Sequence, residues 1–195
     1  MAPPNLVRVA VASVFSGAFF LQVLYSLGEG ESHAQEVVPP KDLLPPSWQE
    51  ECKFKPPENL TELVLESAQE FGLDPRILAV TVHRESGCDP WAYGAVGEIG
   101  LTQILPKYWV SDLKKQKILN RSQELWDPRT NLRASAWILS TLLERGESKF
   151  EMFRRYNGRG PKARKYAQEQ QQALWGIIQQ DRKSRTPVSG PPSRP

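Results

Sequence analysis

Histidine and cysteine are scarce in this sequence of 195 residues, which contains two of each. His33 lies in a polar N-terminal segment, so a catalytic triad would depend on His83, and the sequence has no G-x-S-x-G turn to present a serine nucleophile. Cys52, His83 and Cys88 do not have the close ligand spacing of a typical zinc site. We therefore expect no metal ion, no cofactor and no histidine-activated nucleophile, which leaves carboxylate chemistry.

The chain also lacks a strong excess of charge and long runs of alternating polar and apolar residues. Its net charge is +3 with 24% charged residues, too weak a bias to indicate nucleic acid as a partner. A mildly basic surface does suit other anionic polymers. Because alternating runs are missing, the pattern predicts a mainly α fold, with room for one short β-hairpin near residues 93–100.

An almost wholly apolar run of 19 residues, Val9 to Leu27, follows Arg8 near the N-terminus. Its length exceeds the usual core of a signal peptide and favours a membrane anchor, whereas Ser32-His33-Ala34 is a usable cleavage site and favours removal. Both alternatives export the rest of the chain. We expect a signal peptide or anchor over 1–34, a Pro-rich extended spacer over 35–57, a folded domain over 58–180 and a disordered basic tail over 181–195.

Capping residues and apolar periodicity predict a series of helices within the expected domain. Asn59 with Glu62 resembles a capping box, and Gly72 is a natural stop. Asp-Pro pairs at 74–75 and 127–128 are typical helix starts, with Asp as the N-cap and Pro in the first turn. The second of these helices should end at Gly146, and further helices are predicted from Lys149 to about Arg155 and from Pro161 to Gln180.

One carboxylate lies on the apolar side of a predicted helix. Glu85 follows Leu78 by seven residues and Val82 by three, so it shares a helical stripe with apolar side chains. Burial disfavours the charged form of a carboxyl group and raises its pKa, and a general acid needs such a shift to work at neutral pH. The alternative is a surface glutamate that pairs with Arg84 or a lysine, and periodicity alone leaves both open.

Four short motifs follow one another along the chain. They are Glu85-Ser86-Gly87, then Gly97-Glu98-Ile99-Gly100-Leu101-Thr102-Gln103, then Leu125-Trp126-Asp127-Pro128-Arg129-Thr130-Asn131-Leu132, and then Arg155-Tyr156-Asn157-Gly158. Their order and spacing resemble the soluble lytic transglycosylase (SLT) domain, in the lysozyme-like superfamily, over roughly residues 59–167. Thr102 stands where the family usually has Met, which affects sugar affinity rather than chemistry, and Arg155 stands where it usually has Ala.

The resemblance implies a lysozyme-like fold and cleavage of the β-1,4 bond between MurNAc and GlcNAc in peptidoglycan. By resemblance, Glu85 protonates the glycosidic oxygen and then takes a proton from the C6 hydroxyl of the same MurNAc, whose N-acetyl group assists. The product is a 1,6-anhydro end, formed without water. An ordinary glycosidase needs a second carboxylate, and Glu98 in the Gly-flanked turn is the candidate if the enzyme is a hydrolase similar to goose-type lysozyme.

The resemblance also implies substrate-binding roles for further motif residues, namely Ser86, Thr102, Gln103, Tyr156 and Asn157. Tyr156 is expected to hydrogen-bond the Glu85 carboxyl, with packing in the core as the alternative. Gln103 is expected to contact sugar or to brace the turn. Asn157 is expected to orient the backbone more than to meet substrate, and Ser86 to hold the carboxylate, the N-acetyl group or the helix end.

Aromatic and basic side chains surround these motifs. Trp91, Tyr93, Tyr108 and Trp109 flank the Gly-containing turn, and one or two of them are expected to stack on sugar rings, while the others fill the core. Basic residues gather near Tyr156, as a solvated surface that could also attract an anionic wall polymer: Arg155, Arg159, Lys162, Arg164 and Lys165.

Cys52 and Cys88 are the only cysteines. In an exported protein two cysteines commonly pair. A disulfide between them would fasten the end of the spacer beside the helix that carries Glu85. The alternative is two buried thiols.

Together these expectations describe an exported enzyme of bacterial or phage origin, in the periplasm or cell envelope, either secreted or anchored to the inner membrane. Its expected partners are peptidoglycan glycan strands, and the membrane if the N-terminal segment is retained, but not nucleic acid. The sequence identifies no partner protein of an envelope machine or phage. The alternatives are a lysozyme and a non-catalytic glycan-binding or assembly module with the same fold, against which Glu85, Gln103 and Tyr156 together argue.

Overall fold

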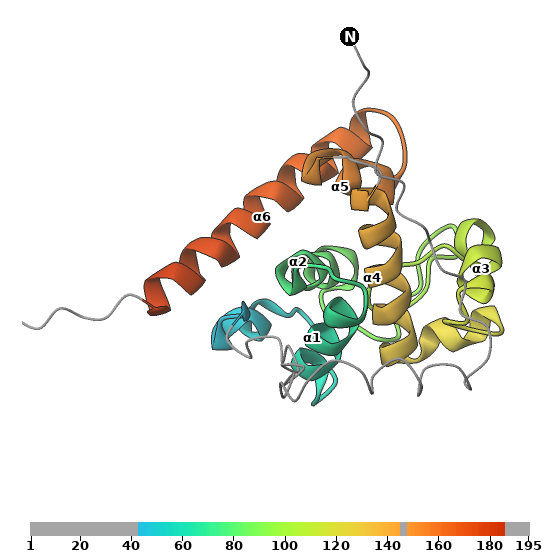
Figure 1. Cartoon of the computed structure of the whole chain (residues 1–195), viewed down its shortest axis with the longest axis horizontal. Helices are drawn as coiled ribbons and strands as arrows, with labels where there is room; N and C mark the ends of the chain where they lie inside the picture. Colours follow the sequence, from blue (N-terminus) through green and yellow to red (C-terminus); the bar gives the residue numbers. More distant parts are fainter. Residues whose placement is uncertain (1–42, 145–147, 186–195) are drawn as a thin grey trace, which may run out of the picture. The chain divides into compact units, whose positions relative to one another are not determined.

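The computed structural model describes residues 43–144 and 148–185, and this part of the chain is almost entirely helical (Figure 1). Its α-helices are α1 (Leu60–Glu70), α2 (Pro75–Ser86), α3 (Pro106–Lys115), α4 (Pro128–Glu144), α5 (Lys149–Asn157) and α6 (Pro161–Arg185), and its 3₁₀ helices are η2 (Pro46–Glu51) and η3 (Ser122–Trp126). Instead of a regular hairpin, two isolated antiparallel bridges join Tyr93 to Ile99 and Ile99 to Ile104. The predicted mainly α fold is confirmed.

The disordered tail predicted from residue 181 begins too early, because α6 continues to Arg185 and Asp181 is buried. The apolar N-terminal run, Gly146 and the rest of the predicted tail lie outside the described residues. The predictions for them therefore stay predictions. Among the helices that are described, none combines the length and the hydropathy that crossing a membrane requires.

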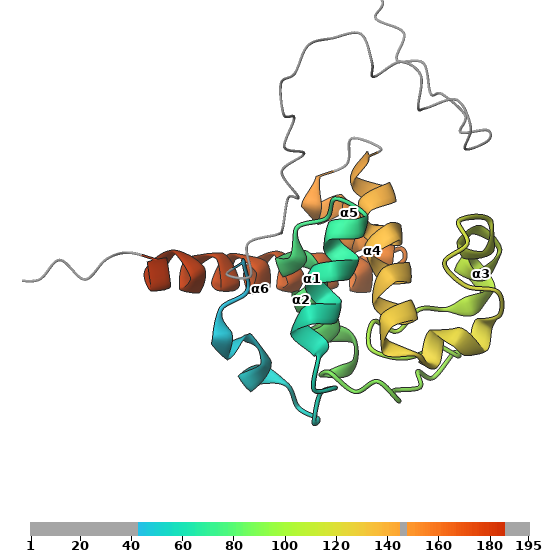
Figure 2. The same cartoon turned by 60° about the horizontal axis from the view of Figure 1, so that its bottom comes forward.

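The helix α4 holds the centre of the domain. It packs against α1 on one side and α5 on another, while α6 packs against α5 and α2 (Figures 1 and 2). Leu132, Ile138 and Leu139 of α4 are completely buried, so this helix turns an apolar face to the core. The burial of this face fixes α2 and α5 on the same framework, and both helices carry residues of the candidate site.

Helix starts follow the sequence signals in most cases. The Asp74 side chain accepts a hydrogen bond from the backbone N–H of Arg76 (3.0 Å), and Asp127 accepts one from the N–H of Thr130 (2.8 Å). The predicted capping box at Asn59 is wrong, because Asn59 precedes α1 but its side chain makes no capping hydrogen bond. The helix α3 was not predicted, since Leu105 in front of it has no side chain that can cap.

The segment before α1 differs from the predicted extended spacer. Residues 46–51 form η2, with a proline at its start where a missing N–H costs nothing. Leu44 and Trp48 are buried in the core, and the indole N–H of Trp48 donates to Thr61 Oγ1 (2.9 Å). The boundary predicted at residue 58 is therefore too late, because the buried indole ties this segment to α1.

A disulfide joins Cys52, directly after η2, to Cys88, just beyond the end of α2. This is the pairing expected from the sequence, in preference to two thiols. Possible ligand atoms of Cys52, His83 and Cys88 lie within 4.8 Å of one another, but the two sulfur atoms are bonded to each other. With the disulfide formed, this group offers no thiolate to a metal ion.

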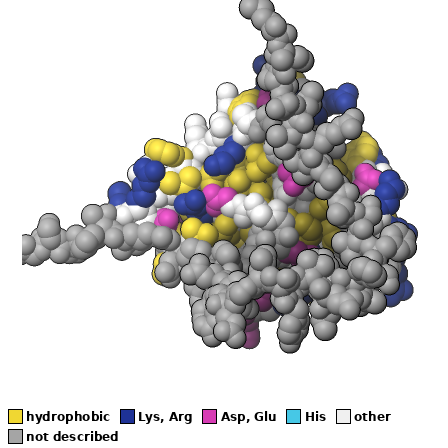
Figure 3. All heavy atoms as spheres, viewed as in Figure 1, with side chains coloured by type: hydrophobic (Ala, Val, Ile, Leu, Met, Phe, Trp, Pro, Cys, Tyr) yellow, Lys and Arg dark blue, Asp and Glu magenta, His cyan; other side chains and the backbone are white. Residues whose placement is uncertain are grey.

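Charge is not segregated on the face shown in Figure 3, where basic and acidic side chains lie among apolar ones. Several acid–base pairs link helices across the surface. Arg133 of α4 donates two hydrogen bonds to Glu70 of α1 (2.6 and 2.5 Å), and Arg84 of α2 pairs with Glu169 of α6 (2.5 Å). Such exposed pairs contribute little stability each.

Candidate active site

Glu85 lies in the last turn of α2, where the helix is stopped by Gly87 in a left-handed conformation (φ 62°). Its carboxyl group borders a cavity of about 630 Å³, a size that suits a sugar unit or more. The remaining lining residues come from four other parts of the chain. They are Glu98, Gln103, Ile104 and Leu105 of the Gly-containing turn and the residues just after it, Tyr108 and Trp109 of α3, Ile138 of α4, and Arg155, Tyr156, Asn157, Gly158 and Arg159 at the end of α5 and in the loop after it.

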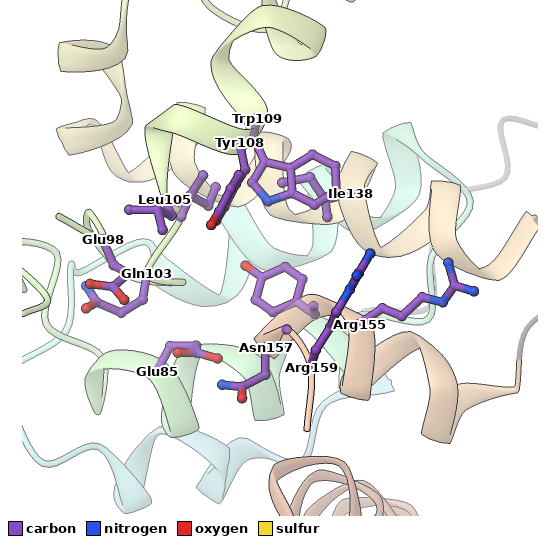
Figure 4. A pocket seen from close by; sticks show the side chains of 13 residues that line it. Glu85, Glu98, Gln103, Leu105, Tyr108, Trp109, Ile138, Arg155, Asn157 and Arg159 are labelled. Atoms are coloured by element: carbon purple, nitrogen blue, oxygen red, sulfur yellow. The ribbon is translucent and has the colours of Figure 1, made fainter. Parts of the chain in front are cut away.

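Figure 4 shows the polarity of this cavity. Glu98 and Gln103 lie at one end, Arg155 and Arg159 at the other, and Glu85 faces the space between them from below. Tyr108 and Trp109 close the side opposite Glu85. The cavity therefore offers an acid, an apolar wall and a cationic end to a ligand, which is a suitable lining for a polar sugar with apolar ring faces.

The pKa of Glu85 is raised from its ordinary 4.5 to about 7. Burial of the carboxyl group is the main cause, and the negative charge of Glu98 adds to it, while a hydrogen bond from Tyr166 and the positive charge of Arg84 oppose it. A carboxyl group with this pKa is partly protonated at neutral pH and can both give and take a proton there.

Tyr166 of α6 is the closest polar neighbour of the acid. Its hydroxyl donates to Glu85 Oε1 (2.5 Å) and accepts a hydrogen bond from Gln170 Nε2 (3.0 Å). Tyr166 lies outside the four motifs of the sequence. No local signal distinguishes it, because its role depends on the crossing of α6 over α2.

The prediction that Tyr156 hydrogen-bonds Glu85 is wrong. Tyr156 lines the cavity, but its hydroxyl donates to the carbonyl oxygen of Thr102 (2.9 Å) and lies 3.0 Å from Ser135 Oγ. Burial, with the negative charge of Glu85 as a second cause, raises the pKa of Tyr156, so its hydroxyl stays neutral. Tyr156 thus fixes α5 to the turn that lies beside the acid.

The substrate-binding role predicted for Thr102 is also wrong. Its side chain is completely buried, does not line the cavity and donates to Asn131 Oδ1 (2.6 Å). Asn131 also accepts from the N–H of Thr102 (3.0 Å) and donates to the carbonyl oxygens of Ile99 and Leu125 (2.9 Å each). All the hydrogen-bonding capacity of the Asn131 side chain is used in holding the turn.

Glycine is required at position 100 of this turn. Its φ is +75°, and a Cβ atom there would lie 2.5 Å from Asn131 Nδ2 and 2.9 Å from the carbonyl oxygen of Leu125. Only a residue without a side chain lets the buried asparagine reach the backbone of the turn. The Gly-x-x-Gly spacing therefore has a structural cause, and it brings the neighbouring Gln103 to the cavity.

Gln103 and Ser86 both brace the turn. The amide nitrogen of Gln103 donates to the carbonyl oxygens of Ala92 and Gly100 (3.0 Å each), although the side chain also borders the cavity. Ser86 Oγ donates to the carbonyl oxygen of Leu101 (2.8 Å), and Ser86 is not among the lining residues. Of the alternatives for Ser86, the geometry favours bracing of the helix end.

Glu98, Arg155 and Arg159 also border the cavity. Glu98 Oε2 accepts from the N–H of Val96 (3.1 Å), and the side chain borders the cavity with Glu85. Arg155 and Arg159 flank Tyr156 in the chain and reach the same cavity, as does Asn157. Their place in a run of basic residues gave no indication that Arg155 and Arg159 border the cavity.

Comparison with known proteins agrees with this architecture. Residues 62–178, more than half of the chain, match the transglycosylase SLT domain family. Among solved structures, the chain is similar to the lytic transglycosylase Slt of Pseudomonas aeruginosa, determined by X-ray crystallography as an inactive Glu-to-Gln mutant, with a TM-score of 0.55 and 20% identity over 60% of this chain and 24% of that one. At this identity the likeness concerns the fold, and the aligned region spans about a quarter of that enzyme. No curated protein sequence gives a significant match.

Proposed function

The chain belongs to the transglycosylase SLT domain family, and we propose that it is a peptidoglycan lytic transglycosylase in which Glu85 acts first as the acid and then as the base. The substrate is the glycan strand, cut at the β-1,4 bond between MurNAc and GlcNAc. The observation that carries this proposal is the Glu85 carboxyl group at the wall of a cavity of sugar size, where desolvation raises its pKa to about 7.

The reaction balances with one carboxyl group. Glu85 donates its proton to the glycosidic oxygen as the bond from that oxygen to C1 of MurNAc breaks, and the N-acetyl group of MurNAc stabilises C1. The Glu85 carboxylate then removes the proton from the C6 hydroxyl, whose oxygen bonds to C1. The 1,6-anhydro product forms, no water is consumed, and Glu85 is protonated again for the next cycle.

Tyr166 supports both states of Glu85. Its hydrogen bond to Oε1 leaves the second carboxyl oxygen to carry the proton toward the substrate. Because Tyr166 in turn accepts from Gln170, its hydroxyl hydrogen is directed at the carboxyl group. We therefore assign Tyr166 as a positioning residue, which acts on substrate through Glu85.

A hydrolase is the second candidate, because Glu98 borders the same cavity and its charge acts on Glu85. In that case Glu98 would activate water, and the product would carry a reducing end. The side chain of Glu98 accepts a hydrogen bond from its own turn, at Val96, a contact that suits a structural role equally well. A module that only binds glycan has no use for a desolvated acid, which costs stability above neutral pH.

The proposal includes export to the periplasm or cell envelope, where peptidoglycan is found, either as a released protein or held by the apolar run at 9–27. The disulfide between Cys52 and Cys88 supports an oxidising compartment. No further protein partner is proposed.

The test is digestion of purified peptidoglycan with the full chain and with Glu85→Gln, followed by mass spectrometry of the released fragments. Fragments lighter by one water than hydrolysis products, and absent with the variant, are the expected result. Fragments with reducing ends that disappear in Glu98→Gln would instead identify a hydrolase. Strand binding without any released fragment would overturn both enzymatic candidates and leave a binding module.

A further inference from the structure

Two large aromatic side chains lie exposed on the loop that follows α2. Trp91 and Tyr93 are each 70% exposed, although side chains of this size usually bury most of their surface. Both stack on Trp126, with ring centroids 6.3 and 6.1 Å apart and planes inclined by only 26° and 25°. These three residues form what we call the aromatic platform. Trp126 itself packs partly against the core and so supports the two outer rings.

The aromatic platform belongs to the same loop as the candidate active site. Ala92, between Trp91 and Tyr93, accepts the hydrogen bond from Gln103 Nε2, and Gln103 borders the cavity. The next residue, Gly94, donates its N–H to the carbonyl oxygen of Glu98 (2.9 Å), another lining residue. The platform is therefore tied to one end of the cavity, the end formed by Glu98 and Gln103 in Figure 4.

The hydroxyl of Tyr93 and a side chain of the cavity wall, Leu105, both lie beside Gly97. A Cβ atom on Gly97 would lie 3.7 Å from Tyr93 Oη and 3.8 Å from Leu105 Cδ1, and Leu105 lines the cavity. The backbone of this loop is also fixed, since Trp91 donates its N–H to Asp89 Oδ1 (2.9 Å). The rings are thus held on a braced loop beside the cavity, which lowers the entropy cost of binding a ligand on them.

We propose that the aromatic platform of Trp91, Tyr93 and Trp126 is a distal sugar-binding site, which stacks against pyranose rings of the glycan strand beyond the cavity. This inference rests on the proposed function, because it takes the strand in the cavity as the ligand that continues onto the platform. The apolar faces of pyranose rings, like other flat apolar groups, pack well on aromatic rings. A polymeric substrate is the occupant that can fill the cavity and the adjoining platform at the same time, and linked contacts of this kind raise affinity without any new strong bond.

The experiment compares binding of long and short peptide-free glycan strands, fractionated by size, to the full chain carrying Glu85→Gln, which prevents turnover. Titration calorimetry is repeated after adding Trp91→Ala, Trp91→Phe or Trp175→Ala. Trp175 is the matched control, because it is an exposed tryptophan (58%) on α6 whose ring is covered by Arg182 rather than by other aromatic rings.

We expect Trp91→Ala to weaken binding of long strands by about 3- to 10-fold, as the loss of one aromatic stacking contact predicts. The effect on strands too short to extend beyond the cavity is smaller, so the advantage of long strands shrinks. Trp91→Phe, which keeps a ring, recovers most of the affinity, and Trp175→Ala leaves it unchanged. Tyr93→Ala, made in parallel, reproduces the effect of Trp91→Ala, and the melting temperature of each variant shows that the fold is intact.

The inference is overturned if Trp91→Ala and Tyr93→Ala bind long strands as tightly as Trp175→Ala does. It is equally overturned if long and short strands lose affinity by the same factor, or if the Glu85→Gln reference binds no strand. Failure of the proposed function has a different signature, because the unmodified chain would then bind strands without releasing anhydro fragments from them.

Discussion

Two polar regions border the turn at residues 97–103, and they use their polar groups in opposite ways. In the first region, Asn131 uses all its hydrogen-bonding capacity on Thr102, Ile99 and Leu125. In the second, Glu85 is largely desolvated but receives one hydrogen bond, from Tyr166, and otherwise faces a cavity. The first arrangement stabilises the fold, whereas the second raises the pKa of an acid at some cost in stability.

The difference explains how one short segment can serve both regions. A satisfied buried network holds backbone atoms in place, and the turn it holds carries Glu98 and Gln103 to the cavity. Tyr156 helps to hold the turn through its hydrogen bond to the carbonyl oxygen of Thr102, whereas Tyr166 hydrogen-bonds the acid itself. The four predictions below test this division, in order of decreasing expected effect.

Replacing the acid should separate activity from stability most clearly. Glu85→Gln is expected to lower the rate of strand cleavage by about 10³-fold, the effect of removing a general acid and base. At alkaline pH, by contrast, this variant should be more stable than the native protein. Because the folded protein holds the Glu85 proton up to a pKa of about 7 and an unfolded chain releases it near 4.5, the native protein loses stability as the pH rises between these values.

The variant lacks this loss, so it should exceed the native protein in unfolding free energy at about pH 8 by up to about 3 kcal/mol, and equal it at about pH 4. Urea denaturation at the two pH values measures the difference. A variant that is less stable than the native protein at both would contradict the assigned desolvation of Glu85.

Breaking the structural network should instead lower the stability of the fold. Asn131→Ala removes four hydrogen bonds and leaves the buried N–H of Thr102 without its partner, which should cost about 3 kcal/mol of unfolding free energy. Asn157→Ala is the control, because Asn157 is exposed at the cavity, and its stability should change by less than about 0.5 kcal/mol. A loss below 1 kcal/mol for Asn131→Ala, measured in urea, would show that the turn does not depend on this network.

The two tyrosines should differ in their effect on pH dependence. Tyr166→Phe removes a hydrogen bond that lowers the pKa of Glu85, so the pKa should rise and the alkaline fall of kcat/KM should move to higher pH. A loss of about 10- to 100-fold at neutral pH accompanies it, as for a hydrogen bond to a charged group.

Tyr156→Phe is the comparison for this prediction. It removes the bond to Thr102 and should cost about 1 kcal/mol of stability while leaving the alkaline limb close to its original position. Identical pH profiles for the two variants would refute the separate roles given to the tyrosines.

The smallest effect is expected at an exposed ion pair on the surface. Glu70→Gln breaks the pair with Arg133 that joins α1 to α4, and the pKa of Glu70 is lowered by the hydrogen bond from Arg133. Because the pKa of Glu70 is lower in the folded protein than in the unfolded chain, the pair stabilises the fold at pH values above the ordinary pKa of a glutamate and no longer does so in acid. Solvent screens this exposed pair, which keeps its contribution small. The expected cost is under about 1 kcal/mol at neutral pH and vanishes at low pH. A thermal melt in low and high salt measures it, and a cost that salt does not reduce would count against an electrostatic origin.

The local signals in the sequence were sufficient for much of the fold. Asp-Pro pairs marked the starts of α2 and α4, because these signals act within a single helical turn. They failed at Asn59, at α3 and at η2. At η2, the burial of Trp48 and its hydrogen bond to Thr61 decide the conformation of a proline-rich segment that local propensity describes as extended.

By itself, the sequence determined the mainly α fold, the position of Glu85 on an apolar helical stripe and the Gly-x-x-Gly turn that follows it. Each depends on residues close together in the chain, and periodicity and backbone freedom act at that range. The tertiary structure alone decided that Tyr166 rather than Tyr156 contacts the acid, that Thr102 is buried by Asn131, and that Trp91 and Tyr93 gather on Trp126. These contacts join residues from 29 to 81 positions apart, or depend on a ring that a separate segment supplies, and the packing of helices, not local pattern, sets which side chains meet.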